Sequence, residues 1–125
     1  MNNNILIIDD DDELSEEIAE ILKDEGYKVT VAFNGLDGKS LIEKNKYNLL
    51  LLDLKIPGLT GFDILKIVKP KIKDLKVLVL TGRPLSKNHL KKKAPEEETL
   101  KLADGIMNKP FEIEILLQTI KGLIV

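Results

Sequence analysis

The sequence predicts an α/β fold, a three-layer α/β/α sandwich around a five-stranded parallel sheet. Four short apolar runs are typical of strands that are buried on both faces. These runs are residues 5–8, 49–52, 77–80 and, more weakly, 106–108. Segments of helix length separate them, and a further strand is expected at 27–33. The alternation therefore predicts five strands and five helices in one domain over residues 1–125.

The first half of the chain places two helices between its strands. Asp11 or Asp12 can cap the first helix, whose apolar residues are spaced by four, three and one. The features that follow are a helix stop at Gly26, a strand over 27–33, a turn at Asn34-Gly35 and a helix over 36–44. Gly38 interrupts the apolar face of this second helix, which makes it the least regular of the helices.

The second half contains two regular helices and one irregular segment. A third helix opens at Gly61, and Pro70 is expected to end or kink it because proline lacks an amide donor. The last helix covers 112–123 and has an apolar face directed at the core. The segment between Thr81 and Lys109 is the least regular, and before the weak strand at 106–108 we expect a loop and a short helix with Pro95 as an N-terminal residue.

Composition excludes several classes of function. The formal net charge of −2 argues against a basic face for nucleic acid, so no direct nucleic-acid binding is expected. The chain has no cysteine and hence no disulfide, thiol chemistry or zinc–thiolate cluster. No signal-peptide pattern is present, and no apolar stretch approaches the roughly 20 residues of a membrane span. We therefore expect a cytoplasmic protein without membrane insertion.

Polar residues that phosphoryl chemistry can use stand where the apolar runs end. Asp9 and Asp10 follow the run at 5–8, and Asp53 follows the run at 49–52. Thr81 follows the run at 77–80, and Lys109 follows the run at 106–108. In an open parallel sheet, ligands bind outside the carboxyl ends of the strands. These side chains are therefore expected to converge on one place, although they are spread over the whole chain.

The convergence predicts a magnesium-dependent phosphoryl site. Three neighbouring carboxylates repel one another unless a cation or a proton is present. A site that offers a few oxygen ligands from the protein and leaves the other positions to water suits Mg²⁺. The natural division is that Asp9 and Asp10 hold the metal while Asp53 acts as a nucleophile and forms an aspartyl phosphate. Lys109 supplies positive charge to the phosphoryl oxygens, and the Thr81 hydroxyl supplies a hydrogen bond.

Taken singly, each of these residues has a simpler explanation. Aspartate after a strand commonly starts a turn or caps a helix, which is the role expected of Asp11 and Asp12. His89 is expected to be a solvated residue, since nothing beside it suggests a ligand set. A cis bond between Lys109 and Pro110 would direct the lysine into the site. It is the combination of residues, on different strands, that indicates function.

From end to end, the chain resembles the receiver domains of two-component response regulators, in particular single-domain receivers of the chemotaxis-regulator type. Four strings carry the resemblance. They are Ile-Leu-Ile-Ile-Asp-Asp-Asp (5–11), Leu-Leu-Asp-Leu-Lys-Ile-Pro-Gly-Leu-Thr-Gly-Phe-Asp-Ile-Leu (51–65), Leu-Thr-Gly (80–82) and Asn-Lys-Pro-Phe (108–111). The combination is highly specific, whereas any single string is not.

The resemblance implies a flavodoxin-like fold with strand order 2-1-3-4-5. It implies that Asp53 accepts a phosphoryl group from a sensor histidine kinase or a phosphotransfer protein, and that Thr81 and Lys109 contact that group. The implied Mg²⁺ ligands are Asp9, Asp10, Asp53 and the backbone carbonyl of Lys55. Magnesium-dependent self-phosphorylation and dephosphorylation would be the only reactions, and the changed surface would bind or release a downstream protein, which the sequence does not identify.

Three features depart from the family pattern. Ile106 occupies the position, three residues before the lysine, where receivers usually carry a tyrosine or phenylalanine that swings inward, so this aromatic switch is absent. The segment between Thr81 and Lys109 is longer than is usual, which puts the choice of partner in doubt. Lys55 stands two residues after the phosphoacceptor, and we predict that it alters the lifetime of the phosphoaspartate.

Three other classes of function remain as alternatives. A degenerate receiver would act as a phosphorylation-independent interaction module; Ile106 and the long segment favour it, and the complete acidic set argues against it. A phosphatase of the haloacid-dehalogenase type would need an acid where Lys55 stands. A flavodoxin-like carrier of flavin mononucleotide ranks last, since the acidic residues after the first strand would repel its phosphate.

Overall fold

The strands form one parallel sheet in the order β2-β1-β3-β4-β5. The computed structural model describes residues 3–82 and 98–124 of the chain. Its strands are β1 (Asn4–Ile8), β2 (Lys28–Ala32), β3 (Leu49–Asp53), β4 (Lys76–Thr81) and β5 (Gly105–Asn108). Each pair of neighbouring strands runs parallel. The predicted strands and their order are thus confirmed, and each strand boundary lies within one residue of the predicted one.

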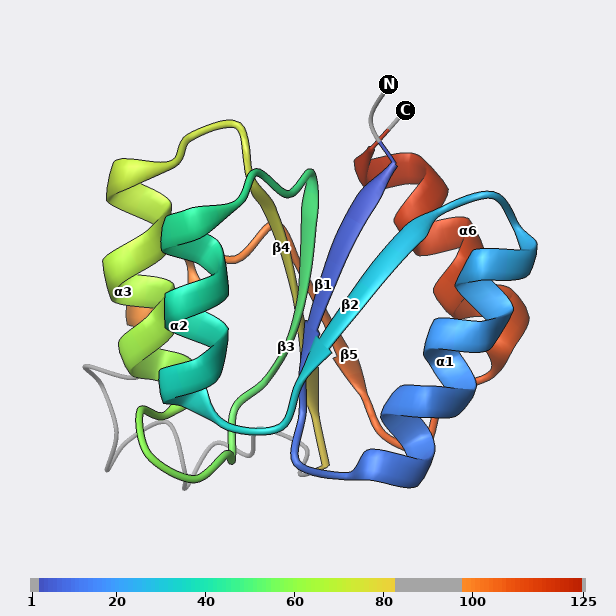
Figure 1. Cartoon of the computed structure of the whole chain (residues 1–125), viewed down its shortest axis with the longest axis horizontal. Coiled ribbons are helices and arrows are strands. Elements are labelled where there is room, and N and C mark those ends of the chain that lie inside the picture. The colour runs from blue at the N-terminus through green and yellow to red at the C-terminus, as the bar shows by residue number, and fades with distance from the viewer. Residues whose placement is uncertain (1–2, 83–97, 125) are drawn as a thin grey trace.

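Helices cover both faces of the sheet, as the predicted fold class requires. Figure 1 shows α2 and α3 packed on one face and α1 and α6 on the other. Their bounds are α1 (Asp12–Asp24), α2 (Gly35–Lys44), α3 (Gly61–Lys71) and α6 (Ile113–Leu123). Residues 98–100 are helical too and lie in the segment where the short helix was expected, whereas Pro95 and His89 fall outside the described residues. Among those residues, no helix combines the length and the apolar character needed to cross a membrane.

The central strand β3 explains why the apolar runs are continuous. Leu49, Leu50, Leu51 and Leu52 are all fully buried. Leu50 and Leu52 pack in the core under α2 and α3, while Leu49 and Leu51 pack in the core under α1 and α6. Because successive side chains point to opposite faces, a strand covered on both sides needs apolar residues at every position.

Local capping residues set the helix boundaries. The Asp11 carboxylate accepts a hydrogen bond from the Leu14 amide at 3.1 Å, so Asp11 rather than Asp12 is the N-cap of α1. Gly26, with a φ of +99°, follows the end of α1 and suits the left-handed conformation required there. Pro70 lies in the last turn of α3, which ends one residue later at Lys71.

The irregular pattern of α2 has a physical reason. Gly38 is buried where the helix lies against β1, and a Cβ atom at this position would overlap the Ile8 side chain. The glycine that interrupts the apolar face therefore allows the helix to approach the sheet closely.

A polar cluster at the amino edge of the sheet was not predicted from the sequence. Asp104 Oδ2 accepts hydrogen bonds from the Lys69 ammonium group and from the Val77 amide, both at 2.8 Å. The Asp104 amide donates in turn to the Val77 carbonyl at 2.8 Å, and Lys69 also donates to the Leu75 carbonyl at 3.1 Å. One carboxylate thus connects α3 with the beginnings of β4 and β5.

Candidate functional site

The predicted site residues lie at the carboxyl edge of the sheet. Asp9 directly follows β1, Asp53 is the last residue of β3, Thr81 is the last residue of β4, and Lys109 directly follows β5. Asp53 is paired in register with Leu80, so Thr81 lies one residue beyond it on the adjacent strand. The fold therefore brings together residues that are up to a hundred positions apart.

Three carboxylates form a compact acidic cluster. One oxygen each of Asp9, Asp10 and Asp53 lies within 4.8 Å of the other two. Asp9 and Asp53 are buried, whereas Asp10 is exposed and opens the cluster to solvent. A hard cation with oxygen ligands fits this donor set, and the exposed side leaves room for waters or phosphoryl oxygens. The residues present therefore fit a magnesium ion.

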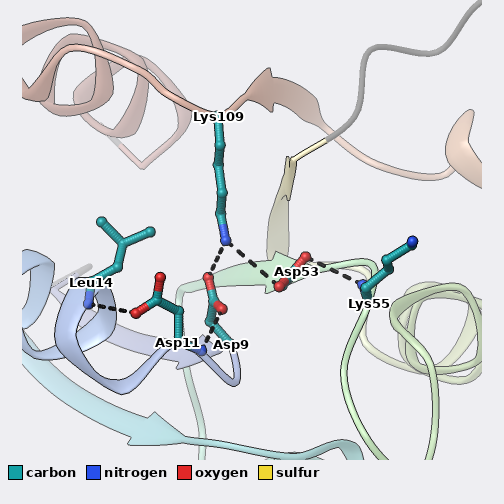
Figure 2. A network of polar contacts seen from close by, with 6 residues as sticks. All are labelled: Asp9, Asp11, Leu14, Asp53, Lys55 and Lys109. Atoms are coloured by element: carbon teal, nitrogen blue, oxygen red, sulfur yellow. Dashed lines mark hydrogen bonds and ion pairs between the residues drawn. The ribbon is translucent and has the colours of Figure 1, made fainter.

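Lys109 is directed at two of these carboxylates. Its ammonium nitrogen lies 2.7 Å from Asp9 Oδ2 and 3.6 Å from Asp53 Oδ2, and Figure 2 shows the side chain reaching down between them. Its backbone amide donates to the Thr81 carbonyl at 2.7 Å, which ties β5 to β4 beside the site. The bond between Lys109 and Pro110 is cis. From the sequence, such a bond is expected to direct the lysine side chain into the site.

Burial and charge shift the proton affinities of these groups. Burial, and then the negative charge of Asp9, raise the pKa of Asp53 to about 6, against the opposing effects of Lys109 and the Lys55 amide. Burial by itself would lower the pKa of Lys109, but its hydrogen bond to Asp9 and the charges of Asp9 and Asp53 outweigh that effect and raise it. The lysine is therefore held in its charged form beside the acidic cluster.

Backbone amides orient the two buried carboxylates. The Lys55 amide donates to Asp53 Oδ1 at 3.2 Å, and the Asp11 amide donates to Asp9 Oδ1 at 3.0 Å. Each carboxylate thus has one oxygen held by the loop that follows it, while its other oxygen faces Lys109. In Figure 2 the long Lys55 side chain extends away from the carboxylates, so this residue is attached to the site through its backbone.

Gly61 supports Asp53 from behind, a role that sequence reasoning missed. A Cβ atom at Gly61 would lie 2.5 Å from the Asp53 carbonyl oxygen and 2.6 Å from the Leu54 Cα atom. The Gly61 amide also donates to the Leu54 carbonyl at 3.1 Å. The start of α3 therefore packs directly on the backbone of Asp53 and Leu54. A glycine at the first helical position, directly after the Thr60 cap, is the signal that could have indicated this contact.

The structure thus places the predicted residues as follows. Asp9, Asp53 and Lys109 are in contact, and Asp10 completes the acidic cluster. Thr81 lies at the neighbouring strand end, and Lys55 contacts Asp53 through its amide. Their roles in metal binding and in phosphoryl transfer stay predictions. The arrangement is suited to a reaction in which negative charge is brought to Asp53 and neutralised by a cation and by Lys109.

Comparison with protein families gives one match over nearly the whole chain. The family model described as "Response regulator receiver domain" matches residues 5–121. Among curated proteins, the probable transcriptional regulator ycf29 of Porphyra purpurea is 31% identical over 99% of this chain, and the uncharacterized transcriptional regulatory protein YkoG of Bacillus subtilis is 33% identical over 95%. The matches cover 57% and 50% of those two proteins, so this chain spans about half of their length.

Solved structures show the same architecture. The response regulator TrrA of Thermotoga maritima, in complex with Mg²⁺ and BeF, superposes with a TM-score of 0.83 at 28% identity over 97% of this chain and 98% of that one. A CheY-like response regulator receiver domain protein from Methanospirillum hungatei superposes with a TM-score of 0.83 at 30% identity, over 98% and 93% of the two chains.

Proposed function

Because this chain belongs to the response regulator receiver domain family, we propose that it is the phosphoacceptor of a two-component phosphorelay, with Asp53 as the residue that takes the phosphoryl group. One observation carries the proposal. The Asp53 carboxylate lies in a cluster with Asp9 and Asp10 and faces the Lys109 ammonium group at 3.6 Å. A nucleophile, a metal-binding pair and a positive charge are the groups that the reaction needs.

Asp9, Asp10 and Asp53 would hold a magnesium ion, together with the backbone carbonyl of Lys55. When bound, Mg²⁺ supplies positive charge that offsets the phosphoryl oxygens and the carboxylates. The Mg²⁺–BeF complex of TrrA, a chain of the same fold at 28% identity, supports this assignment.

The side chains of this protein would carry the transfer itself. An oxygen of ionised Asp53 attacks the phosphorus atom of a phosphohistidine; a P–O bond forms, the P–N bond breaks, and its electron pair remains on the imidazole. Lys109 turns from Asp9 toward the phosphoryl oxygens, a small movement because its ammonium nitrogen already lies between the two carboxylates. The Thr81 hydroxyl donates a hydrogen bond to another phosphoryl oxygen. Hydrolysis of the aspartyl phosphate by water returns the resting state.

The donor would be a sensor histidine kinase or a phosphotransfer protein, and the setting would be the cytoplasm, where such donors present their phosphohistidine. Phosphorylation would shift the population between two forms of the molecule, and a downstream protein would respond according to its different affinities for them.

A second candidate is a phosphorylation-independent interaction module. Ile106 favours it, because this residue on β5 is 44% exposed and stands where an aromatic switch residue would be expected. The two candidates differ in one respect that can be measured, the ability of Asp53 to accept a phosphoryl group.

The deciding experiment is intact-protein mass spectrometry after incubation with acetyl phosphate, with and without Mg²⁺, on the parent protein and the Asp53→Asn variant. We expect one added phosphoryl group, dependent on Mg²⁺ and absent from the variant. Because a short-lived adduct could escape detection, binding of beryllofluoride is followed in parallel by ¹⁹F NMR. If the parent protein neither gains a phosphoryl group nor binds beryllofluoride, the interaction module becomes the better explanation.

A further inference from the structure

The loop from β3 to α3 begins directly after Asp53, the proposed phosphoacceptor. It covers residues 54–60, and it contains the backbone carbonyl of Lys55 that would bind Mg²⁺. A backbone carbonyl lies in a rigid peptide plane, so its direction depends on how the chain on both sides is held. Because Mg²⁺ demands nearly ideal octahedral geometry, the direction of this carbonyl is expected to affect the affinity for the metal.

The first half of this loop is held from within the molecule. The side chains of Leu54 and Ile56 are buried and belong to the core that lies under α2 and α3. Between them, the Lys55 amide donates to Asp53 Oδ1 at 3.2 Å, as Figure 2 shows. The core and the Asp53 carboxylate thus fix the chain on the side of Lys55 that is nearer to the site.

The second half of the loop is held by the start of α2. Figure 1 shows this start beside the loop, at the lower end of the molecule. The Gly35 amide donates to the Pro57 carbonyl at 3.0 Å. A Cβ atom at Gly35 would overlap the Leu59 carbonyl oxygen and would lie 2.8 Å from the Leu59 carbonyl carbon. Only glycine therefore allows the backbone of α2 to lie so close to the backbone of the loop.

Leu36 adds a side-chain contact to the same junction. At 63% it is the most exposed large hydrophobic residue among those that the structure describes. Gly58, in the turn of the loop, has a φ of +81°, a conformation that favours glycine. A Cβ atom at Gly58 would lie 3.5 Å from Leu36 Cγ, so the leucine side chain lies against this turn. The leucine thus covers the turn from outside, although most of its own surface meets water.

We propose that Gly35 and Leu36 are positioning residues, which hold the loop that presents the Lys55 carbonyl to Mg²⁺. Both act through the loop, and neither belongs to the acidic cluster. The inference rests on the proposed function and adds two residues of α2 on which the affinity for the metal depends. Two observations carry it, the backbone contact of Gly35 with the loop and the contact of Leu36 with the turn.

The expected effect is on the affinity for Mg²⁺ and not on the transfer step. Groups behind the ligands of a metal orient those ligands, and their loss typically lowers metal affinity about 10- to 100-fold. At saturating Mg²⁺ the carbonyl is drawn back into place, and Asp53, Thr81 and Lys109 are unaltered. The Mg²⁺ concentration that gives half-maximal phosphorylation should therefore rise, while the maximal rate stays within about twofold of that of the parent protein.

Two variants with matched controls test the assignment. Gly35→Ala forces the backbones of α2 and the loop apart. Its control, Ile42→Ala, opens a cavity under the same helix and leaves Gly35 and Leu36 in place. Leu36→Ala removes only the side chain that covers the turn, and its control, Ile115→Ala, shortens a residue of α6 that is 48% exposed.

Three measurements are made on each protein. Isothermal titration calorimetry gives the Kd for Mg²⁺, and phosphorylation by acetyl phosphate is followed as a function of the Mg²⁺ concentration. Amide hydrogen exchange of Lys55 in the metal-free protein reports how firmly the loop is held without any metal. This third measurement separates a loose loop from a direct effect on the bound ion.

We expect Gly35→Ala to raise the Kd for Mg²⁺ at least about tenfold. Leu36→Ala should raise it about two- to fivefold, because only a side-chain contact is lost. In both variants the Lys55 amide should exchange faster than the change in global stability accounts for. Both controls should keep the Kd of the parent protein, although Ile42→Ala is less stable.

An unchanged Kd for Mg²⁺ in Leu36→Ala and in a folded Gly35→Ala, or an equal rise in Ile42→Ala, would overturn the assignment. A lower maximal rate with an unchanged half-maximal Mg²⁺ concentration would overturn it as well. If Gly35→Ala does not fold, Leu36→Ala decides alone, since its side chain is largely in water. The proposed function would survive each of these results, because it fails only if the parent protein accepts neither a phosphoryl group nor beryllofluoride.

Discussion

Asp53 destabilises the metal-free protein, because burial and the charge of Asp9 raise its pKa to about 6. An acid whose pKa is higher in the folded than in the unfolded state binds its proton more tightly when folded, so stability falls as the pH rises from about 4 to about 6. Above that range the full penalty remains. We expect Asp53→Asn, in the presence of a chelator, to increase the free energy of unfolding at about pH 7.5 by about 1–3 kcal/mol.

Urea denaturation of both proteins at about pH 7.5 and pH 4.5 checks this expectation. The gain from the substitution should shrink at the lower pH, where Asp53 in the parent protein is already protonated. An equal gain at both pH values would show that the charge of Asp53 is not the cause.

Ser15 is another residue whose environment does not suit it. Its side chain is fully buried on α1, and its hydroxyl oxygen has no hydrogen-bond partner among residues 3–82 and 98–124. A buried hydroxyl without a partner costs about 1–3 kcal/mol, so Ser15→Ala should stabilise the protein by about 1–2 kcal/mol. Ser40→Ala, at a half-buried position of α2, is the matched control and should give only the roughly 0.5 kcal/mol expected from helix propensity. Equal gains in the two variants, measured by urea denaturation, would contradict the expectation.

Between elements, Asp104 connects α3 to the beginnings of β4 and β5. Burial raises the pKa of its carboxyl, but the hydrogen bonds from Lys69 and Val77 outweigh that effect and lower it. An acid with a lowered pKa stabilises the fold at pH values above its unfolded pKa, and this contribution is lost as the pH falls through the folded pKa. We expect Asp104→Asn to destabilise the protein by about 1 kcal/mol at neutral pH, a modest value because the pair is partly open to solvent.

The loss caused by Asp104→Asn should diminish as the pH falls from about 4 through the lowered pKa of the folded protein, below which the parent carboxylate is protonated as well. Asp74→Asn, which removes an exposed acid from the same edge of the sheet, is the control and should have little effect. A loss of stability of the same size at low pH would show that the charge of Asp104 is not the cause.

The contact between α3 and β3 fixes the position of Asp53, the proposed phosphoacceptor. Gly61 leaves no room for a Cβ atom beside the Asp53 carbonyl and the Leu54 backbone. Gly61→Ala should therefore shift the acceptor strand or the helix, slow phosphorylation by acetyl phosphate at least several-fold and weaken Mg²⁺ binding. Gly122→Ala on α6, where a Cβ atom would meet nothing within 4 Å, should leave both unchanged. Wild-type rates in a folded Gly61→Ala protein would show that this contact does not position Asp53.

At the scale of the whole molecule, the sequence predicts the architecture because burial on both faces leaves a direct signature. Residues 49–52 are apolar without interruption and prove to be the most central strand. The site is predictable for a related reason, since polar residues at the carboxyl ends of parallel strands have only one place to meet. Asp9, Asp53 and Lys109 therefore converge as expected.

Sequence patterns did not predict the contacts that depend on how helices and strands pack together. Asp104 and Lys69 are far apart in the chain, and neither follows the carboxyl end of a strand, where a polar residue would indicate a site. Gly38 interrupts the apolar pattern of α2, because such a pattern counts only apolar side chains. The structure shows that the absence of a side chain at Gly38 is what lets the helix lie against Ile8. Such contacts arise from the distance between layers, which no local pattern encodes.

Lys109 couples the fold to the proposed metal site. In the metal-free protein its ammonium group offsets the charges of Asp9 and Asp53, so it occupies part of the role that we propose for Mg²⁺. A ligand that binds only the folded state stabilises it by RT ln(1 + [L]/Kd). Mg²⁺ should therefore raise the free energy of unfolding of the parent protein, by about 1–2 kcal/mol at roughly ten times its Kd or above.

This increase in the free energy of unfolding should be larger in Lys109→Ala, where no ammonium group competes and the carboxylates repel one another unopposed. Asp9→Asn should lose most of it. Urea denaturation with MgCl₂, compared with NaCl at equal ionic strength, measures the three differences. A smaller Mg²⁺ effect in Lys109→Ala than in the parent protein would mean that the lysine assists metal binding instead of competing with it.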